Sequence, residues 1–403
     1  MLLIEDDEED YLITKDMLTT EAPDRFELVW AANLAQGLQK LDAPLDGVLL
    51  DLSLPDSQGW DTFTRVQQHA RQLPIILLTG MADEELGVRA VHAGAQDYLV
   101  KGRMDGYLLV RAITYAIERK RTEDKLEHVA RRLRATNAEL AADLQMARDV
   151  QEGLLPHSYP PFPASATPED SALTFSHRYE PCRALGGDFF YLLPLSDSMA
   201  AVFICDVMGH GMRAALVTAI IRGMIEELRP HAGHAAPFMT ELNRGLTSVL
   251  RRPDQFIFVS AAYLVVDLEK GVLTCANAGH PWPMLIRPGQ GACKIEGTRA
   301  PAGPVLGLNE DQAYEYVTVQ LQERDSLLMF TDGLYEVHDP EGREYGEDRL
   351  KQAIDAHTAQ PLDNILGAVL ESANTFSDTP EPEDDICLVG MTVNRIGASL
   401  PRP

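Results

Sequence analysis

The segment from residue 105 to residue 155 contains no proline, and its apolar residues return at every seventh position. The repeating residues are Leu126, Leu133, Leu140, Ala147 and Leu154. A seven-residue apolar repeat without helix breakers predicts one long helix. This helix would divide the chain into a domain over 1–104, a helical linker over 105–155, a domain over 156–396 and a C-terminal tail over 397–403.

The linker helix is expected to pair with a second copy of itself. The positions complementary to the repeat are Ala130, Asn137, Leu144 and Gln151. A polar Asn at such a position fixes the register of a two-stranded coiled coil, so we predict a homodimer formed through residues 105–155. The alternative is one amphipathic helix that packs on its own domains. Basic and acidic residues are interleaved along it, which is typical of a solvated helix face.

The composition excludes several classes of protein. The net charge is -26, which argues against nucleic acid as a partner because phosphate backbones require Lys and Arg. No apolar run approaches the roughly 18 residues of a membrane span, and no leader peptide is evident. The five cysteines are scattered and form no Cys-x-x-Cys pair, as expected in a reducing compartment. We therefore expect a cytoplasmic protein with no membrane contact.

The first domain alternates short apolar stretches with helix-like segments. The apolar stretches are 2–4, 46–50, 74–78 and 97–100, and the helix-like segments are 10–20, 33–41, 59–71 and 84–94. This alternation predicts an α/β fold with a parallel sheet and helices on both faces. Polar residues follow the predicted strands, namely Glu5, Asp6, Asp51, Thr79 and Lys101. The carboxyl ends of parallel strands carry the working residues of such folds, so we expect these five to form one site.

Four motifs in this domain resemble those of two-component receiver domains. They are Leu-Leu-Ile-Glu-Asp-Asp (2–7), Leu-Leu-Asp-Leu-Ser-Leu-Pro-Asp (49–56), Ile-Leu-Leu-Thr-Gly (76–80) and Asp-Tyr-Leu-Val-Lys (97–101). The resemblance implies a five-stranded parallel, doubly wound sheet, and phosphorylation of Asp51 by a sensor histidine kinase. It also implies a Mg²⁺ ion held by Glu5, Asp6, Asp51 and the main-chain carbonyl of Ser53, because hard oxygen ligands suit that ion.

The same resemblance assigns a conformational switch. Lys101 and the metal ion would stabilise the charge on the transferring phosphoryl group. Thr79 would donate its hydroxyl to that group and turn inward, with Tyr98 following it. The sequence departs from many receivers at Gly102, where they carry Pro, so we expect a looser loop around Lys101.

The second domain changes to a β-rich pattern. Strands are predicted at 199–205, 256–266, 272–276, 314–320, 326–330 and 386–392, and helices at 211–228, 236–251, 347–356 and 362–374. Strands grouped apart from helices predict a layered α+β domain, with an antiparallel sandwich flanked by helices. Carboxylates stand in short motifs beside apolar residues, at Asp188, Asp206, Asp332 and Asp384. Buried carboxylates need a cationic partner, and metal ions are the expected one.

Six motifs in residues 145–395 resemble the metal-dependent serine/threonine phosphatases of the type 2C superfamily, in particular the bacterial sporulation and stress-response branch. They are Ala-Arg-Asp-Val-Gln-Glu-Gly-Leu-Leu-Pro (147–156), Leu-Gly-Gly-Asp-Phe-Phe (185–190), Asp-Val-Met-Gly-His-Gly (206–211), Asn-Ala-Gly-His-Pro (277–281), Phe-Thr-Asp-Gly-Leu (330–334) and Glu-Asp-Asp-Ile (383–386). The resemblance implies two Mn²⁺ or Mg²⁺ ions and a metal-activated water.

The resemblance also assigns the ligands. Asp206 would bridge both ions, Asp188 and the carbonyl of Val207 would complete one, and Asp332 and Asp384 would hold the other. Asp385 replaces Asp384 as the ligand if the register is shifted by one residue. Two more positions stay open. His210 is either a general acid or a structural residue, and Tyr191 stands where many relatives have a further Asp that could support an outer metal shell.

The combined resemblances predict a response regulator whose output is protein dephosphorylation. The expected substrate is a phosphoserine or phosphothreonine on an anti-sigma-factor antagonist, as in partner-switching control of transcription. The alternative is a non-catalytic adaptor that binds a sigma factor or its regulator according to the phosphorylation state of Asp51. Neither direction of control is excluded, with activation by phosphorylation preferred.

Overall fold

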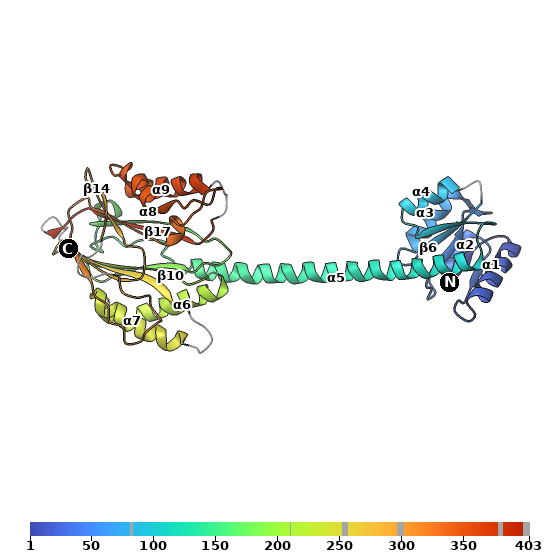
Figure 1. Cartoon of the computed structure of the whole chain (residues 1–403), viewed down its shortest axis with the longest axis horizontal. Coiled ribbons are helices and arrows are strands. Elements are labelled where there is room, and N and C mark those ends of the chain that lie inside the picture. Colours follow the sequence, from blue (N-terminus) through green and yellow to red (C-terminus); the bar gives the residue numbers. More distant parts are fainter. Residues whose placement is uncertain (81–83, 210, 252–256, 296–301, 378–381, 398–403) are drawn as a thin grey trace. The chain divides into compact units, whose positions relative to one another are not determined.

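The computed structural model describes residues 1–80, 84–209, 211–251, 257–295, 302–377 and 382–397. The predicted His210 and all but the first residue of the predicted tail lie outside this part of the chain. The structure falls into two compact units, Met1–Glu139 and Leu140–Pro403, which are described separately (Figure 1). Within the described ranges, no helix is long and apolar enough to cross a membrane.

The first unit is built on a parallel sheet, as predicted. Its strands are β1 (Leu2–Ile4), β2 (Val29–Ala31), β3 (Val48–Asp51), β6 (Ile75–Thr79) and β7 (Asp97–Val100), in the spatial order β2-β1-β3-β6-β7. A short hairpin of β4 (Ser53–Leu54) and β5 (Ser57–Gln58) follows β3. The edge strand β2 was absent from the predicted apolar stretches. It is short, and only its last residue is buried, so its apolar signal is weak.

Helices cover both faces of this sheet. They are α1 (Glu8–Glu21), α2 (Leu34–Lys40), α3 (Gly59–His69), α4 (Glu84–His92) and the first turns of α5 (Gly106–Glu152). Alternate strand residues point to opposite faces. Leu2, Ile4 and Leu50 therefore share one core with residues of α2, α3 and α4, whereas Leu3 and Leu49 share the other with residues of α1 and α5. This is the predicted doubly wound arrangement.

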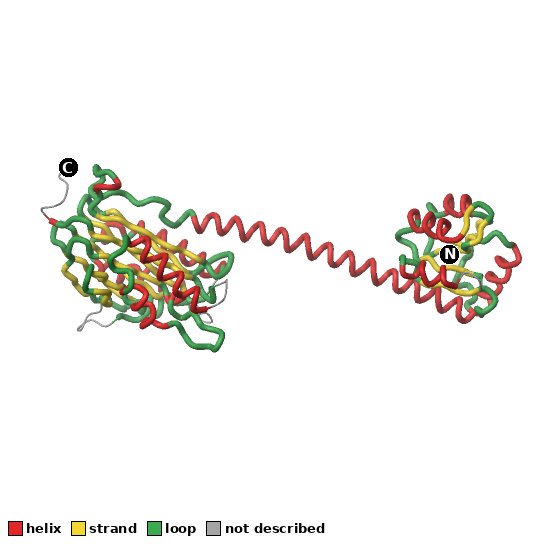
Figure 2. The backbone as a smooth tube through the Cα atoms, turned by 90° about the horizontal axis from the view of Figure 1, so that it is seen from above, coloured by secondary structure: helices red, strands yellow, loops and turns green. Residues whose placement is uncertain are grey.

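Helix α5 is one uninterrupted helix of 47 residues (Figure 2). The exposure of its side chains changes along its length. Leu109 and Ile113 are fully buried against the sheet of the first unit. Leu126, Leu133 and Leu140 are exposed, at 65%, 59% and 55%. These three leucines are therefore largely exposed in this chain, whereas the heptad residue Leu154 packs on the core of the second unit.

The second unit is a sandwich of two antiparallel sheets. One contains β9 (Asp188–Pro194), β10 (Met199–Val207), β11 (Val259–Asp267), β12 (Val272–Ala278) and β15 (Val317–Gln320). The other contains β8 (Leu173–Glu180), β13 (Met284–Arg287), β14 (Gly291–Lys294), β16 (Ser326–Phe330) and β17 (Ile386–Val393). The largest core lies between them.

A pair of helices covers the outer face of each sheet (Figure 1). Helices α6 (Met212–Glu227) and α7 (Ala235–Leu250) pack on the first sheet, and α8 (Gly346–Asp355) and α9 (Leu362–Ser377) on the second. Short 3₁₀ turns occur at Pro168–Asp170, Arg229–His231 and Asp332–Leu334. The layered sandwich was predicted.

Strands β8, β9, β13 and β14 were missed by the sequence analysis. The residues of β8 are mostly half-buried, and β9 is a mixed run without alternation, so neither shows a clear strand period. Strands β13 and β14 are four residues each, which is too short for a periodic signal.

Candidate functional sites

The predicted receiver residues converge at the carboxyl end of the parallel sheet. Glu5 follows β1 and Asp51 ends β3, and these two strands are neighbours in the sheet. The carboxylates of Glu5, Asp6 and Asp51 each offer an oxygen atom within 4.8 Å of the others. Three hard oxygen donors at this spacing fit a small divalent cation such as Mg²⁺.

Lys101, just after β7, reaches into the same group of carboxylates. Its Nζ lies 2.7 Å from Glu5 and 2.8 Å from Asp10, and it also hydrogen-bonds to Asp51. Burial alone would lower the pKa of Lys101, but the hydrogen bonds to Asp10, Asp51 and Glu5 raise it above its ordinary value. Burial raises the pKa of Glu5 to about 7, against the opposing effect of Lys101. Asp10 was not among the predicted residues, because nothing in the sequence brings it near Lys101.

The predicted switch residues lie beside this group. The Ser53 backbone N–H donates to Asp51 Oδ1 at 2.8 Å. Thr79 is buried at the end of β6, and its hydroxyl donates to the Leu99 carbonyl at 3.5 Å. The ring of Tyr98 packs on Gly87 of α4, where a Cβ would lie 2.8 Å from two ring carbons. Tyr98 is therefore in direct contact with α4.

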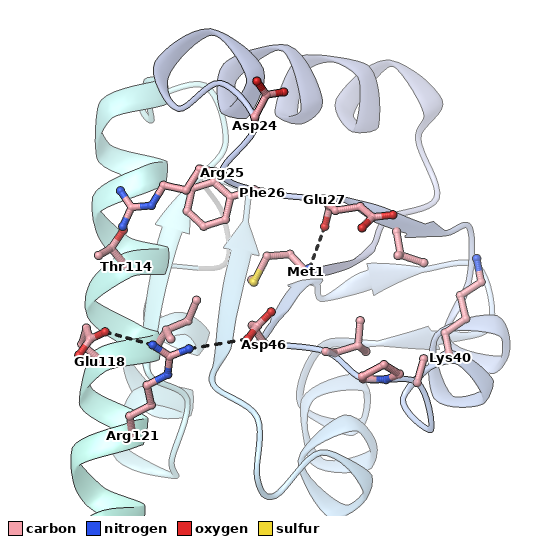
Figure 3. A pocket seen from close by; sticks show the side chains of 15 residues that line it. Met1, Asp24, Arg25, Phe26, Glu27, Lys40, Asp46, Thr114, Glu118 and Arg121 are labelled. Carbon is pink, nitrogen blue, oxygen red and sulfur yellow. Dashed lines mark hydrogen bonds and ion pairs between the residues drawn. The ribbon is translucent and has the colours of Figure 1, made fainter.

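The first unit also contains a cavity of about 690 Å³, at the opposite end of its sheet (Figure 3). Met1, Glu27 and Asp46 line it, and Met1 and Asp46 precede β1 and β3, whose far ends carry the acidic group. Arg121 of α5 crosses it, 3.3 Å from Glu118 and 3.9 Å from Asp46. Its lining mixes both signs of charge, and it is separate from the predicted site.

In the second unit, two neighbouring strands place Asp188 and Asp206 side by side. The two residues are direct partners in the antiparallel pairing of β9 with β10. Asp188 is buried, and its Oδ2 accepts a hydrogen bond of 2.6 Å from the Thr331 hydroxyl. Thr331 belongs to the opposite sheet and is itself fixed by the Cys387 backbone N–H at 2.9 Å. The Asp188 carboxylate is thus held from both sheets.

Asp332 and Asp384 approach the same centre from loops that follow β16 and precede β17. Burial, together with the neighbouring charges of Asp332 and Asp384, raises the pKa of Asp206 to about 7. Burial and Asp206 raise the pKa of Asp188 strongly. Burial and Asp384 also raise the pKa of Asp332. These shifts mean that the carboxylates repel one another in the absence of a cation.

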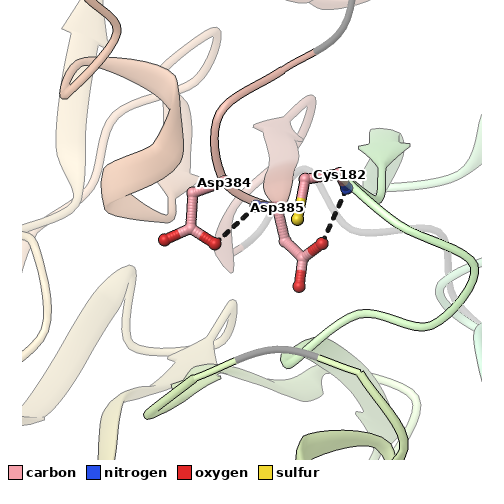
Figure 4. A group of neighbouring side chains, drawn as sticks. All are labelled: Cys182, Asp384 and Asp385. Carbon is pink, nitrogen blue, oxygen red and sulfur yellow. Dashed lines mark hydrogen bonds between the residues drawn. The ribbon is translucent and has the colours of Figure 1, made fainter.

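The neighbouring Asp384 and Asp385 differ in their surroundings (Figure 4). Asp385 is buried, and its carboxylate accepts the backbone N–H groups of Cys182 at 2.8 Å and Gly187 at 2.5 Å. Asp384 is exposed, and within the described part of the chain its carboxylate accepts one hydrogen bond, from the Asp385 N–H at 2.8 Å. Both carboxylate oxygens of Asp385 therefore accept hydrogen bonds from the backbone before Asp188, whereas Asp384 has oxygen lone pairs that can bind a metal ion. This geometry favours Asp384 as the ligand.

Two glycines allow the backbone to close around this centre. A Cβ on Gly187 would lie 2.8 Å from the Val207 carbonyl oxygen. A Cβ on Gly333 would lie 2.1 Å from the Asp385 carbonyl oxygen. Larger residues would push apart the segments that carry the aspartates, which explains the glycines of the Gly-Gly-Asp and Thr-Asp-Gly motifs.

The donor set fits divalent metal ions. Among the described residues, no Lys or Arg forms an ion pair with any of these aspartates, which are Asp188, Asp206, Asp332, Asp384 and Asp385. Carboxylates that face one another without a cationic side chain are stable only when protonated or bound to metal. Hard oxygen donors select Mg²⁺ or Mn²⁺ over softer ions.

Tyr191, which stands where many relatives have a further Asp, forms its contacts with α6. Its hydroxyl donates to Glu226 at 3.1 Å and accepts from Arg222 at 2.8 Å, and both partners lie on α6. The guanidinium of Arg222 also lies over the Tyr191 ring, 3.8 Å from its centroid. Residues 188 and 191 of a strand point to opposite faces, so Tyr191 joins β9 to α6.

The end of α5 makes a direct contact with the loop that carries Asp188. The Gln151 side chain is buried, and its amide donates to the Gly186 carbonyl at 2.8 Å and accepts from the Gly186 N–H at 3.2 Å. It also lies 3.5 Å from the Thr218 hydroxyl of α6. The seven-residue repeat predicted that Gln151 lies in the coiled-coil seam. Its position corrects that assignment, because this residue packs on its own domain.

Comparison with known proteins supports both halves of this description. The model of the response regulator receiver domain matches residues 1–113, and the model of Stage II sporulation protein E (SpoIIE) matches residues 196–394. The chain is a receiver domain joined to a metal-dependent protein serine/threonine phosphatase domain of the PP2C type. Within that type, the phosphatase domain resembles the SpoIIE branch.

Individual relatives agree with this classification. Phosphoserine phosphatase RsbU of Bacillus subtilis (strain 168) is 25% identical over 260 residues, which cover 64% of this chain and 72% of RsbU. The transcriptional regulatory protein CpxR of Escherichia coli (strain K12) is 35% identical over 111 residues, which cover 28% of this chain and 46% of CpxR. The SiaA-PP2C domain of Pseudomonas aeruginosa has the same fold, with a TM-score of 0.54 and 22% identity, and it matches 64% of this chain and 98% of that domain.

Proposed function

We propose that this chain hydrolyses phosphoserine or phosphothreonine on a protein, and that phosphorylation of Asp51 by a sensor histidine kinase controls the reaction. The convergence of Asp188, Asp206, Asp332 and Asp384, without a cationic side chain among the described residues, carries the proposal. Carboxylates in this arrangement repel one another unless a cation is bound between them, so the arrangement suits a metal-dependent enzyme better than a non-catalytic adaptor.

The positions of the residues support the proposed ligand roles. Asp206 lies next to Asp188 and is influenced by Asp332 and Asp384, so it is placed to bridge two Mn²⁺ or Mg²⁺ ions. Asp188 and the carbonyl of Val207 would hold one ion, and Asp332 and Asp384 the other. When bound, such ions lower the pKa of a bridging water and neutralise phosphoryl oxygens. Thr331 and Asp385 would act by holding Asp188 and its loop in place.

The receiver would hold Mg²⁺ through Glu5, Asp6, Asp51 and the carbonyl of Ser53. The clustering of the three carboxylates supports this site. Lys101 already contacts Asp51, so it is placed to stabilise a phosphoryl group formed there. Thr79 and Tyr98 would change position when Asp51 is phosphorylated. The contact of Tyr98 with Gly87 would transmit this movement to α4.

Helix α5 would carry the signal to the phosphatase. It packs in the receiver core through Leu109 and Ile113, and it contacts the Asp188 loop through Gln151. Beside this contact, α5 and α6 enclose an apolar hollow of about 410 Å³, with Val150 and Leu216 in its lining. A displacement of the last turns of α5 would therefore act on the backbone two residues before Asp188.

A homodimer through residues 105–155 is part of the proposal. The exposed Leu126, Leu133 and Leu140 are spaced by seven residues, and a second α5 would bury them. Exposed leucines in a regular stripe are costly to leave in water, at about 25 cal/mol per Å² of apolar surface. Pairing of this middle stretch does not require the buried Gln151 to leave its contact.

Similarity to RsbU, whose name describes a phosphoserine phosphatase, supports the substrate class. An anti-sigma-factor antagonist is the proposed substrate protein. The competing function is a non-catalytic adaptor that binds a sigma factor or its regulator. The intact set of four aspartates favours the enzyme, since an adaptor gains nothing from carboxylates that repel one another.

The test is phosphatase turnover of the purified chain on a generic phosphate ester with Mn²⁺, with and without beryllofluoride as a mimic of phosphorylated Asp51. We expect metal-dependent turnover that changes with the mimic and disappears in Asp206→Asn. Asp51→Asn should keep basal turnover and lose the response to the mimic. Turnover that persists in Asp206→Asn would refute the assigned centre. No turnover on the ester or on a phosphorylated antagonist would favour the adaptor.

A further inference from the structure

Lys101 has one carboxylate partner that the phosphorylation chemistry does not require. Its three partners are Glu5 at the end of β1, Asp51 at the end of β3, and Asp10 in the first turn of α1. Asp10 does not belong to the carboxylate group of Glu5, Asp6 and Asp51 that fits a metal ion. Its Oδ2 atom lies 2.8 Å from the Lys101 Nζ, which is a full charge-assisted hydrogen bond.

The ammonium group of Lys101 is surrounded by these carboxylates. A lysine side chain has three N–H donors and no acceptor, and here it donates hydrogen bonds to Asp10 and Asp51 and forms an ion pair with Glu5 at 2.7 Å. A phosphoryl oxygen on Asp51 would need one of these donors. The phosphoryl group would take the place of the Asp51 carboxylate and compete with Asp10 for the Lys101 ammonium.

The three partners differ in how easily they can be released. The side chain of Glu5 is 1% exposed and that of Asp51 is 9% exposed, whereas that of Asp10 is 39% exposed. A buried carboxylate that loses its partner pays a large desolvation penalty. Asp10 can exchange Lys101 for water, because it lies at the rim of the site.

We infer that Asp10 is a positioning residue that holds Lys101 in the unphosphorylated receiver and releases it to the phosphoryl group on Asp51. This inference rests on the proposed phosphorylation of Asp51. The bond between Lys101 and Asp10 stabilises only the unphosphorylated state, so its loss shifts the equilibrium toward the phosphorylated one. The negative charge of Asp10 also repels an anionic phosphodonor as it approaches.

The experiment compares full-length Asp10→Asn with Glu9→Gln and Asp10→Glu. Asp10→Asn removes the charge at nearly constant size. Glu9→Gln removes one charge from the same turn of α1, where Glu9 is exposed and forms no ion pair within the described residues. Asp10→Glu keeps the charge and should restore the wild-type behaviour. Thermal unfolding of each variant establishes that it is folded.

The first measurement is a beryllofluoride titration at saturating Mg²⁺, followed by tryptophan fluorescence. Trp30 is a suitable reporter, since its indole N–H donates to the Glu5 carbonyl at 2.7 Å. The second is the rate at which acetyl phosphate phosphorylates Asp51, followed by gel-shift electrophoresis. In that reaction the Asp51 carboxylate forms the new P–O bond, and acetate leaves with the electron pair of the broken one.

We expect Asp10→Asn to bind beryllofluoride and accept the phosphoryl group about two- to fivefold better than wild type, the range that corresponds to a partly exposed ion pair. Glu9→Gln and Asp10→Glu should match wild type. An unchanged or weaker response of Asp10→Asn would overturn the inference, as would an equal gain in Glu9→Gln. A wild-type chain that responds to neither reagent would refute the phosphorylation of Asp51 itself, and the inference would fall with it.

Discussion

Replacing Gln151 by Ala tests whether the end of α5 controls the metal centre. In the wild-type chain, the Gln151 amide forms two hydrogen bonds with the backbone of Gly186, which is buried. Truncation removes both and leaves one N–H and one carbonyl without a protein partner. Gly186 stands two residues before Asp188, so any movement that restores its hydrogen bonds also displaces that carboxylate.

The magnitude follows from the two orphaned groups. Each buried polar group without a partner costs about 1–3 kcal/mol, so the native loop loses roughly 2–6 kcal/mol. If the loop moves so that these groups find new hydrogen-bond partners, part of the lost free energy is recovered, but the position of Asp188 changes. A remaining loss of about 1.4 kcal/mol corresponds to a tenfold change in metal affinity. We therefore expect at least about a tenfold rise in the Mn²⁺ concentration that gives half-maximal turnover.

The assay is a Mn²⁺ titration of ester hydrolysis, with Gln145→Ala as the matched control. Gln145 lies on the same helix, is exposed, and bonds only to Asp149 in the next turn. It should leave the metal dependence unchanged. If Gln151→Ala loses thermal stability but keeps the wild-type Mn²⁺ dependence, then the contact only supports the fold, and the proposed path from α5 to Asp188 is refuted.

Three further predictions concern other parts of the chain. Asp384→Asn should lose metal-dependent turnover with little change in thermal stability. Asp385→Asn should lower the melting temperature, because the Asp385 carboxylate accepts two backbone N–H groups. The reverse pattern would make Asp385 the ligand. Leu133→Asp should yield monomers in light scattering and abolish the response to beryllofluoride, and a dimer that still responds would contradict the proposed coiled coil. Burial lowers the pKa of His280 from 6.5 to about 3, so the folded state holds this imidazole in its neutral form. The free energy of unfolding should therefore fall as the pH drops below 6.5, by about 2 kcal/mol at pH 5. Chemical denaturation at pH 7 and pH 5 should show a smaller difference in His280→Gln, and an equal difference would refute this assignment.

Much of the receiver could be predicted from its sequence because its site depends on strand order. Each working residue lies at or just after the carboxyl end of a strand, and parallel strands bring these ends together. Asp10 could not be found this way. It lies on α1, and its contact with Lys101 spans 91 positions of the chain, so only the folded structure reveals it.

The phosphatase domain was predicted less completely because its centre is assembled from two sheets. The motifs identified Asp188 and Asp206, but strand β9, which carries Asp188, was missed. Thr331 holds Asp188 across the sandwich, a contact that no local pattern encodes. The sequence also could not distinguish Asp384 from Asp385, whereas the two backbone N–H donors on Asp385 separate them.

The heptad repeat shows the limit of periodicity as evidence. A seven-residue stripe identifies the face of a helix that is to be buried, but it does not identify what buries it. In α5, that stripe is exposed at Leu133 and Leu140, and buried against the same chain at Gln151. A coiled coil that extended through Gln151 would have to break both bonds to Gly186, whereas one that ended before it would leave them intact. If α5 pairs as proposed, the length of the paired segment would set whether Gln151 still holds the backbone before Asp188. A change in pairing along α5 would then be enough to alter the proposed metal centre.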